Sequence, residues 1–321
     1  MLRHVMTAAA LALFGLSSAQ AQTYPNQPIT VIVPYAPGGN TDVVGRIVTE
    51  QMSAILGQKL VIENIGGAGG TTGSLKAARA TPDGYTLIYN SLNHTINSLV
   101  MKQPGYDPVK DFAPITLVQF SPSVLVVGTA QPWNSVQDLV QAAKGSPGSI
   151  TFGSAGVGGS AHLTAELLRA QAGANMTHVP FRGNGPALVD VIAGQVSFIF
   201  HPMGGLQDFV ASRRVRALGI TTAQRHPQFP EVPTMKELGF SGFEEAHSWS
   251  GMLAPAGTSA AIVDKLSAIL LKSMESGGMK KRAETYGTTL VGGTPEDFRR
   301  FLVNDAERWR RVIRNAGIRP E

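Results

Sequence analysis

The chain has 321 residues, no cysteine, and 27 lysines and arginines against 22 aspartates and glutamates. This length suggests two domains and permits a large core that needs no disulfide or structural metal. With 43% hydrophobic and only 15% charged residues, the composition excludes intrinsic disorder and coiled coil. The lack of cysteine excludes thiol catalysis, iron–sulfur clusters and cysteine-zinc sites.

The N-terminus predicts a secretory signal peptide over residues 1–21. The basic Arg3 precedes an apolar run over residues 5–16, and residues 19–21 give an A-x-A cleavage pattern. The run is shorter than the ~20 residues that span a bilayer, which favours a cleaved signal over a membrane anchor. We therefore expect an exported, periplasmic protein that begins near Gln22, does not span the membrane and does not bind nucleic acid.

The first part of the mature chain alternates strand-like and helix-like segments. The β-branched runs predict strands, the helical spacing of apolar residues predicts helices, and glycine-rich turns separate them. In chain order these are a strand at 29–34, a helix from residue 41, a strand at 60–65, a helix to about 80 and a strand at 85–89. This order is typical of a parallel sheet with right-handed crossovers.

The alternation starts again after Phe112 and ends in helices. We expect strands at 123–127, 150–152, 177–179, 196–200, 215–220 and 251–254, and helices at 135–143, 160–171, 186–193, 260–274, 279–286 and 295–315. The last helices have too few strands for a sheet of their own, so we expect them to pack on the first unit. This predicts an α/β protein of two lobes, residues 22–122 with 250–321 and residues 123–249, joined by crossings near residues 121–123 and 247–251.

Three glycine-rich turns, at residues 36–40, 66–70 and 153–160, each join a strand to a helix. Such turns lie at the carboxyl ends of parallel strands, where helix N-termini present free N–H groups to anions. A phosphate-binding loop is rejected at residues 66–72, which lack the required lysine. Residues 156–161 fit G-x-G-x-x-A but lack the acidic residue that would hold a ribose. A small-anion site is favoured, and turns without a ligand are the alternative.

Catalytic motifs are missing from the sequence. There is no H-E-x-x-H, no G-x-S-x-G and no paired-histidine metal spacing. Ser248 beside His247 is not favoured as a catalytic pair, because adjacency in sequence does not place a base on a nucleophile. His162, in the first turn of a helix, is expected to be a structural hydrogen-bond donor. His201 is left open between a ligand contact and packing between the lobes.

Seven segments of the chain resemble the periplasmic Bug-type receptors of tripartite tricarboxylate transport systems. They cover the mature chain in order: PYAPGGNTD at 34–42, IGGAGGTTG at 65–73, YDPVKDF at 106–112, FGSAGVGGSAHL at 152–163, VPFRGNGP at 179–186, EVPT at 231–234 and WSGMLAPAGT at 249–258. The resemblance implies a hinged, two-lobed "Venus flytrap" receptor with a mixed sheet flanked by helices in each lobe. It also implies no catalytic residues, no cofactor and no metal.

The resemblance also implies which residues grip a carboxylate between the lobes. In the first lobe these are Tyr35, Ala36, Gly38, Gly39, Thr41 and Asp42, with Asn90 and Asn93 in a neighbouring loop. Opposite them lie Ser154, Ala155, Gly158 and Ser160. Asp42 is the acid in these loops, and its position at a helix start favours capping of that helix.

One departure from the family pattern concerns the ligand. Many Bug-type receptors have an aspartate after the strand over 196–200, and this chain has His201. An ammonium group would lose its counter-ion there, so we predict an amine-free dicarboxylate or aromatic acid over an amino acid. If the ligand is a dicarboxylate, its affinity is expected to fall as pH rises through the His201 titration.

We therefore predict a periplasmic solute-binding protein for a small carboxylate, monomeric, that serves a membrane permease or a sensor kinase. Two alternatives stay open at this point. One is an exported α/β hydrolase or transferase, which the missing nucleophile motif disfavours. The other is a binding protein used only for signalling, which the sequence does not separate from a transport receptor.

Overall fold

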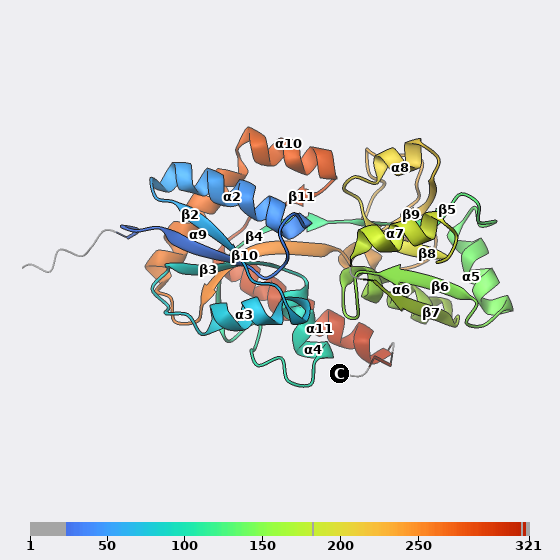
Figure 1. Ribbon diagram of the computed structural model, residues 1–321, viewed down its shortest axis with the longest axis horizontal. Helices are drawn as coiled ribbons and strands as arrows, with labels where there is room; N and C mark the ends of the chain where they lie inside the picture. The colour runs from blue at the N-terminus through green and yellow to red at the C-terminus, as the bar shows by residue number, and fades with distance from the viewer. Residues whose placement is uncertain (1–23, 182, 316, 319–321) are drawn as a thin grey trace, which may run out of the picture.

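The computed structural model describes residues 24–181, 183–315 and 317–318, so the expected signal peptide lies outside the described residues. Two mixed sheets, each flanked by helices, lie side by side along the long axis of the molecule (Figure 1). We call the six-stranded sheet with its helices the first lobe and the five-stranded sheet with its helices the second lobe. Among the described residues, no helix has both the length and the hydropathy to cross a bilayer.

The first sheet has the strand order β11-β4-β10-β3-β1-β2. Its strands are β1 (Ile29–Val33), β2 (Leu60–Asn64), β3 (Thr86–Ser91), β4 (Phe112–Ser121), β10 (Ser248–Pro255) and β11 (Thr289–Leu290). Strand β1 runs parallel to β2 and β3, whereas β10 runs antiparallel to both β3 and β4. The C-terminal part of the chain therefore returns to the sheet that the N-terminal part begins.

Helices cover both faces of the first sheet. They are α2 (Asn40–Leu56), α3 (Thr71–Ala78), α4 (Asn93–Val100), α9 (Ala260–Met274), α10 (Gly277–Tyr286) and α11 (Pro295–Asn315), with a short 3-10 turn, η1 (Ala68–Gly70). Val31 and Val33 pack under α2 and α9, while Ile32 faces the cluster formed with α4 and α11. Burial on both faces explains why β1 is a nearly continuous apolar run.

The second sheet has the order β7-β6-β8-β5-β9. Its elements are β5 (Ser123–Gly128), α5 (Val136–Gly145), β6 (Ile150–Ser154), α6 (Ser160–Ala172), β7 (Met176–Pro180), α7 (Asn184–Ile192), β8 (Phe198–Pro202), α8 (Gln207–Ala211), β9 (Val215–Ile220) and the 3-10 turn η2 (Phe243–Glu245). Strand β6 is parallel to β7 and β8, and β5 is antiparallel to β8 and β9. Helices α5 and α6 pack on one face and α7 on the other.

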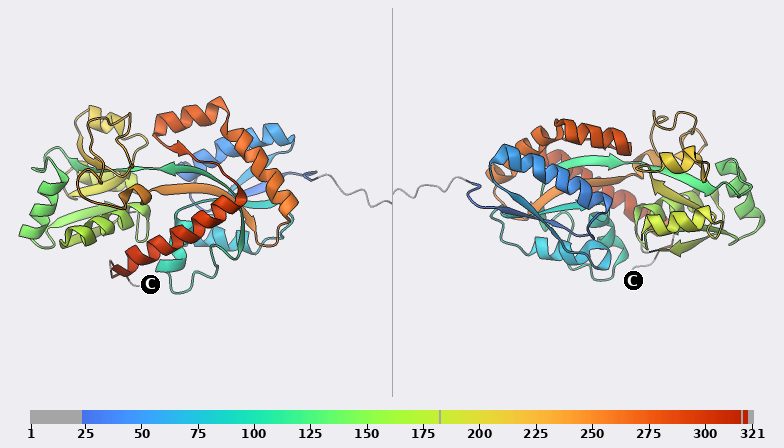
Figure 2. Two further views of the ribbon diagram at one scale, coloured as in Figure 1. Left: turned by 180° about the vertical axis from the view of Figure 1, so that it is seen from behind. Right: turned by 45° about the horizontal axis from the view of Figure 1, so that its top comes forward.

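The two lobes are joined where β4 and β10 end beside β5. Strand β4 ends at Ser121 and β5 begins at Ser123, while Ser248 at the start of β10 pairs with Ser121. The N–H of Met203 in the second lobe donates to the Pro122 carbonyl over 3.1 Å. Helix α11 also reaches past the first lobe and contacts α6 (Figure 2). The crossings therefore lie together at one end of each sheet.

Most expected elements form, and the differences have local causes. Residues 112–121 form a ten-residue strand that the sequence did not predict, because Pro114 and the lack of alternation hide a largely buried strand. Helices α4 and α8 were also not predicted. Strand β8 begins at Phe198 rather than at residue 196, because the Ser197 hydroxyl accepts from the Thr151 N–H over 3.1 Å in place of a ladder bond.

Candidate functional site

The register of the strands places the predicted binding loops at the junction of the lobes. Ser91, the last residue of β3, pairs with Ser250 near the start of β10, at the crossing end of the first sheet. Strand β1 is parallel to β3, so the loop after β1 emerges at the same end. In the second sheet, Pro202 at the end of β8 pairs with Ser123, and the parallel β6 ends on that side too. Both predicted loops therefore face the opposite lobe.

The loop after β1 is held in shape by Asp42. Its carboxylate, 2% exposed, accepts from the Gly38 N–H at 2.9 Å, from Arg46 Nε at 3.0 Å and from Asn64 Nδ2 at 2.8 Å. Burial alone would raise the pKa of the Asp42 carboxyl, but these hydrogen bonds outweigh burial and hold that pKa below its usual value. The carboxylate is thus fully engaged within its own loop.

Tyr35 and Asn90 form a second internal network beneath this loop. The Tyr35 hydroxyl donates to Asn90 Oδ1 over 2.8 Å and accepts from the Ser91 hydroxyl over 2.8 Å. The Asn90 amide nitrogen lies 3.0 Å from Ser74 Oγ and 3.1 Å from His94 Nδ1, and the side chain is 1% exposed. Asn90 therefore supports the loop from below and has no polar atom left for a ligand in this conformation.

The glycine-rich turn after β2 is fastened to helix α4. The Gly69 carbonyl accepts from Asn93 Nδ2 at 3.2 Å and from Asn97 Nδ2 at 3.0 Å. At Gly73 a Cβ would meet the Ile65 carbonyl oxygen at 2.7 Å, so only glycine lets α3 approach β1 this closely. Asn93 is half-buried and thus holds the turn from the edge of the junction.

In the second lobe, Ser154 is tied to a pair of histidines. Its hydroxyl lies 2.6 Å from His178 Nε2 and accepts from the Gly156 N–H over 3.1 Å. The His178 ring stacks on His162 with 3.9 Å between centroids, and burial lowers the pKa of His178 to about 4. This serine and histidine have the spacing of a nucleophile and base, but Ser154 is 0% exposed and cannot reach a substrate. The pair shapes the loop.

His162 was expected to donate a hydrogen bond, and that expectation is wrong at Nδ1. The Gly158 N–H donates to this nitrogen over 3.0 Å, so the imidazole is the acceptor. Burial, with the nearby His178 and Arg169, lowers the pKa of His162 to about 3, which keeps the acceptor nitrogen unprotonated. His162 thus fixes the turn that leads into α6.

Helices α2 and α6 begin in the same way at the junction. Their N-caps, Gly39 and Gly159, are extended and carry no side chain that could accept from the first turn. Helix α5 shows the usual alternative, a capping box in which Ser135 and Asp138 satisfy the N–H groups. The first N–H groups of α2 and α6 are therefore left to an outside acceptor, and the positive end of each helix favours an anion.

A pocket of about 160 Å³ lies between the lobes, and we call it the interlobe pocket. It is lined by Gly38, Asn40, Val43, Ser121, Pro202, Met203, Gly204, Arg282, Tyr286 and Thr288. Its volume holds about five water molecules or a short organic acid. Arg282 and Tyr286 of α10 were not identified from the sequence, because nothing local marks a C-terminal helix as part of a cleft formed by the N-terminal loop.

His201 lies in β8 and precedes Pro202, which lines this pocket. Its Nδ1 donates to the Pro202 carbonyl over 2.7 Å, and burial lowers the pKa of the imidazole below its usual 6.5. The imidazole is therefore neutral at pH 7. Any titration of His201 that affects a ligand is shifted to a more acidic range than the sequence suggested.

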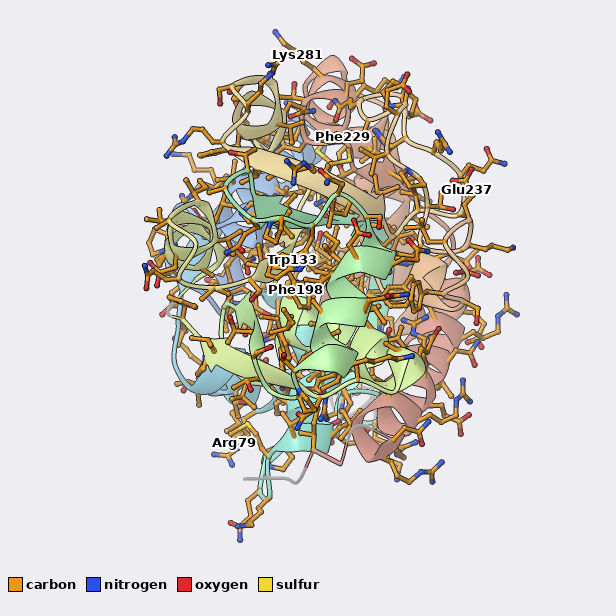
Figure 3. All side chains as sticks on the ribbon, turned by 90° about the vertical axis from the view of Figure 1, so that its right-hand side faces the viewer. Arg79, Trp133, Phe198, Phe229, Glu237 and Lys281 are labelled. Atoms are coloured by element: carbon orange, nitrogen blue, oxygen red, sulfur yellow. The ribbon has the colours of Figure 1, made fainter. Side chains whose placement is uncertain are left out.

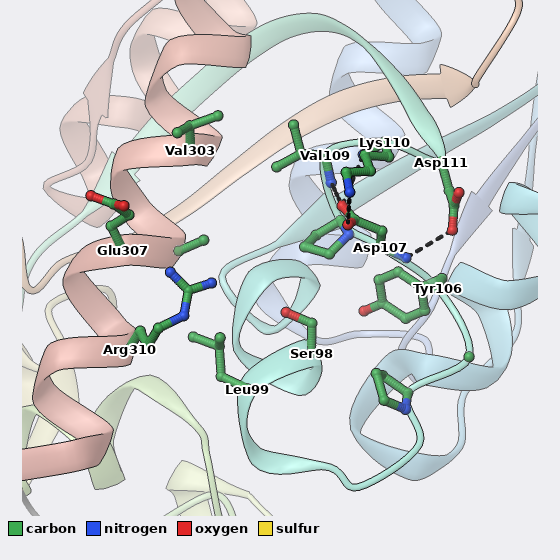
Figure 4. Close-up of a pocket in the computed structure, with 14 residues that line it drawn as sticks. Ser98, Leu99, Tyr106, Asp107, Val109, Lys110, Asp111, Val303, Glu307 and Arg310 are labelled. Carbon is green, nitrogen blue, oxygen red and sulfur yellow. Dashed lines mark hydrogen bonds and ion pairs between the residues drawn. The ribbon is translucent and has the colours of Figure 1, made fainter.

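A wider groove of about 660 Å³ lies elsewhere, between α11 and the loop over residues 104–111 (Figure 4). The acids of this loop are engaged in its own turns: Asp111 accepts from the Asp107 N–H at 2.7 Å, and Asp107 accepts from the N–H groups of Val109 and Lys110. The YDPVKDF segment is thus a structural loop. No residue expected at the site lines this groove.

The expected residues divide into two groups by whether their polar atoms or backbone are already engaged within the protein. Tyr35, Asp42, Asn90 and Ser154 are engaged in hydrogen bonds inside their own lobes. Gly158 is buried against α4 of the first lobe, where a Cβ would lie 3.0 Å from Val100. The exposed or half-buried residues for which no side-chain hydrogen bond is described are Ala36, Gly38, Gly39, Thr41, Ala155 and Ser160; Tyr35, Asn93 and His201 are half-buried but hydrogen-bonded.

Comparison with known proteins gives the family. Residues 44–318 match the family described as "Tripartite tricarboxylate transporter family receptor", TctC. The chain is 34% identical to the protein BugT of Bordetella pertussis, over 93% of this chain and 92% of that one.

Solved structures agree with this assignment. The Rhodopseudomonas palustris protein Rpa4515, solved with adipate, has 32% identity and a TM-score of 0.84 over 93% of this chain and 100% of that one. MatC from the same organism, solved with bound malate, has 31% identity and a TM-score of 0.80 over 90% and 100%. The fold, the motifs and these matches agree, and the chain belongs to the tripartite tricarboxylate transporter receptor (TctC, or Bug) family of periplasmic solute-binding receptors, which are not enzymes.

Proposed function

We propose that this protein captures a small carboxylate between its lobes and presents it to a tripartite tricarboxylate-type permease. The observation that carries the proposal is the pair of uncapped helix N-termini, α2 and α6, at the junction of the lobes. Each offers N–H groups and a partial positive charge, which suit a carboxylate held between them. Relatives solved with adipate and with malate support the same chemistry.

The proposed contacts come from the loops before α2 and α6. Direct contact is assigned to the exposed and half-buried residues of these loops, which are Ala36, Gly38, Gly39, Thr41, Ala155 and Ser160. A positioning role is assigned to Tyr35, Asp42, Asn90, Asn93, Ser154 and Gly158, because their polar atoms or backbone are engaged within the protein. His201 is assigned to the wall of the cleft as a neutral imidazole.

The proposed ligand is a carboxylate without an amino group, either a dicarboxylate or an aromatic acid. A zwitterionic amino acid needs an acceptor or counter-ion for its ammonium once the cleft closes. Asp42 is committed to Arg46 and to its own loop, and among the described residues none that lines the interlobe pocket is acidic. The site therefore favours anions over zwitterions.

The proposed working parts are the two lobes, with residues 22–122 and 250–321 in one and residues 123–249 in the other. Export to the periplasm is proposed from the signal-like residues 1–21. We expect the receptor to act as a monomer. A sensor kinase is the alternative recipient of the loaded receptor.

A thermal-shift panel of the mature protein tests the ligand class. Adipate, succinate, malate and benzoate are compared with glutamate and aspartate at equal concentrations. At about 100 times its dissociation constant, a ligand adds about 2.7 kcal/mol to the free energy of unfolding. We expect at least one amine-free acid to raise the melting temperature more than either amino acid does. Stabilisation by glutamate or aspartate, with none by any amine-free acid, would contradict the proposed ligand class.

A further inference from the structure

The interlobe pocket is lined by a positively charged side chain that has no part in the contacts proposed above between a ligand carboxylate and the loops before α2 and α6. Of the described residues that line it, Arg282 is the charged one, and it comes from α10, far in sequence from the binding loops. No ion pair within the described chain neutralises this guanidinium with a carboxylate. This half-buried guanidinium therefore keeps its positive charge available to an anionic ligand.

Arg282 is held in place but poorly satisfied. Its guanidinium carbon lies 3.2 Å from the centroid of the Tyr286 ring, one helical turn further along α10. Its Nη2 donates to Asn40 Oδ1 over a long 3.3 Å, and its Nε is buried without a hydrogen-bond partner. The guanidinium therefore has hydrogen-bonding capacity that the protein does not use, and its Nη groups are the part that would meet a ligand carboxylate. The ring and Asn40 keep the planar fork oriented, which favours a two-point contact with a carboxylate.

Arg282 comes from a different element than the N-termini of α2 and α6, which are proposed to hold the first carboxylate of the ligand. Asn40, its hydrogen-bond partner, is the first residue of α2, whose N–H groups are proposed to hold one carboxylate. Arg282 belongs to α10 and lines the interlobe pocket together with Pro202 and Gly204 of the second lobe. It is therefore placed to meet a second charged group of the same ligand.

We propose that Arg282 binds the second carboxylate of a dicarboxylate and sets a preference for dicarboxylates over monocarboxylates of equal chain length. The inference rests on the proposed carboxylate-binding function and narrows its ligand class. His201 cannot take this role at neutral pH, because it is uncharged there, whereas arginine keeps its charge.

Lys281 offers a matched control on the same helix. It precedes Arg282, is exposed, and points away from the body of the molecule in Figure 3. Lys281→Met removes the same charge from α10 without touching the pocket. Any effect of overall charge on anion binding appears in this variant too.

The experiment is calorimetry with matched acids: adipate against hexanoate, and succinate against butyrate. The proteins are the mature wild type, Arg282→Met, Arg282→Lys and Lys281→Met. We expect Arg282→Met to weaken dicarboxylate binding about 10- to 100-fold, the value of a charge-assisted hydrogen bond, and to leave the monocarboxylates unchanged. Arg282→Lys keeps the positive charge but loses the planar guanidinium that can bind a carboxylate at two points, so we expect an intermediate loss of dicarboxylate affinity. Lys281→Met should bind as the wild type does.

The outcomes separate the two proposals. Dicarboxylates that bind wild type and Arg282→Met equally would overturn the role of Arg282 and leave the carboxylate receptor intact. An equal loss for the monocarboxylates would assign Arg282 to the first carboxylate and overturn the inference. Wild type that binds none of the four acids would overturn the inference about Arg282, and the thermal-shift panel, which includes benzoate, would then decide the proposed function. Urea unfolding checks the variants, and Arg282→Lys decides the question if Arg282→Met is unfolded.

Discussion

At the scale of single residues, the polar side chains beneath the binding loops are connected. His94 is 0% exposed, with Nδ1 3.1 Å from Asn90 Nδ2 and Nε2 2.9 Å from the Pro108 carbonyl. A carbonyl only accepts, so Nε2 carries the proton and Nδ1 accepts from Asn90. Asn90 in turn accepts from the Tyr35 hydroxyl. Protonation of His94 would therefore disturb the support of the first binding loop.

This arrangement predicts an acid-sensitive contribution to stability from His94. Burial lowers its pKa to about 4 in the folded protein, against 6.5 when unfolded. Its contribution is full above pH 6.5 and is lost as pH falls towards 4, because the unfolded chain takes up the proton first. Between pH 7 and 5 the free energy of unfolding should fall by about 2 kcal/mol on account of this residue.

Urea unfolding of the wild type and His94→Gln at both pH values measures this change. His94→Gln should be less stable at pH 7, and its loss between pH 7 and 5 should be smaller by about 2 kcal/mol. His226→Gln is the control, because His226 is only half-buried. Equal losses in wild type and His94→Gln would show that His94 is not the group responsible.

At the scale of elements, helix α6 begins at the junction of the lobes without a side-chain cap. Helix α5 has a complete capping box, whereas α2 and α6 begin at glycines. Sterics do not require glycine at Gly159: its φ of −67° is ordinary, and an added Cβ would lie 3.4 Å from the nearest atom, the Gly156 carbonyl oxygen. A capping side chain would therefore fit at this position, and under the proposed function the ligand is the acceptor for these N–H groups instead.

The uncapped start predicts opposite effects of Gly159→Asp on stability and on binding. The new carboxylate should accept from the first turn of α6 and add about 0.5–1 kcal/mol of stability. It should also repel the ligand carboxylate and weaken adipate binding at least about tenfold. Gly159→Ala is the matched control, with no new acceptor and nearly unchanged affinity. Calorimetry and thermal unfolding measure both effects. Unchanged affinity in Gly159→Asp would place the ligand elsewhere.

At the scale of the whole molecule, the two lobes meet through few connections. The chain crosses at Pro122 and just before Ser248, and these crossings lie together at one end of both sheets. Beyond them, Gly158 approaches Val100 of α4, and α6 touches α11. A hinge of this kind needs only a few residues to absorb the backbone change when the lobes move.

This architecture predicts that the lobes close on a ligand. Small-angle X-ray scattering of the mature protein should give a smaller radius of gyration with saturating adipate, or whichever acid the thermal-shift panel selects, than without it. Gly159→Asp is the control and should need at least about ten times more ligand than the wild type to reach the same decrease. Identical wild-type profiles at saturation proven by calorimetry would mean that binding occurs without closure.

The sequence by itself determined the fold class and the places of the loops. Buried strands and amphipathic helices have periodic apolar patterns, and glycine-rich turns mark strand ends, so the loops after β1 and β6 could be identified locally. The expected helix at 295–315 agrees with α11, and the family motifs identified the receptor family.

Only the tertiary structure decided which side chains are free and which are engaged. Asp42 and Ser154 have side chains of the kind that often bind ligands. Their hydrogen bonds go instead to Asn64 and to His178, which are 22 and 24 residues away in sequence. Arg282 reaches the interlobe pocket because α10 packs beside α2, and its partner Asn40 is 242 residues away in sequence. Contacts of this kind depend on how sheets and helices assemble, and no local pattern in the sequence encodes them.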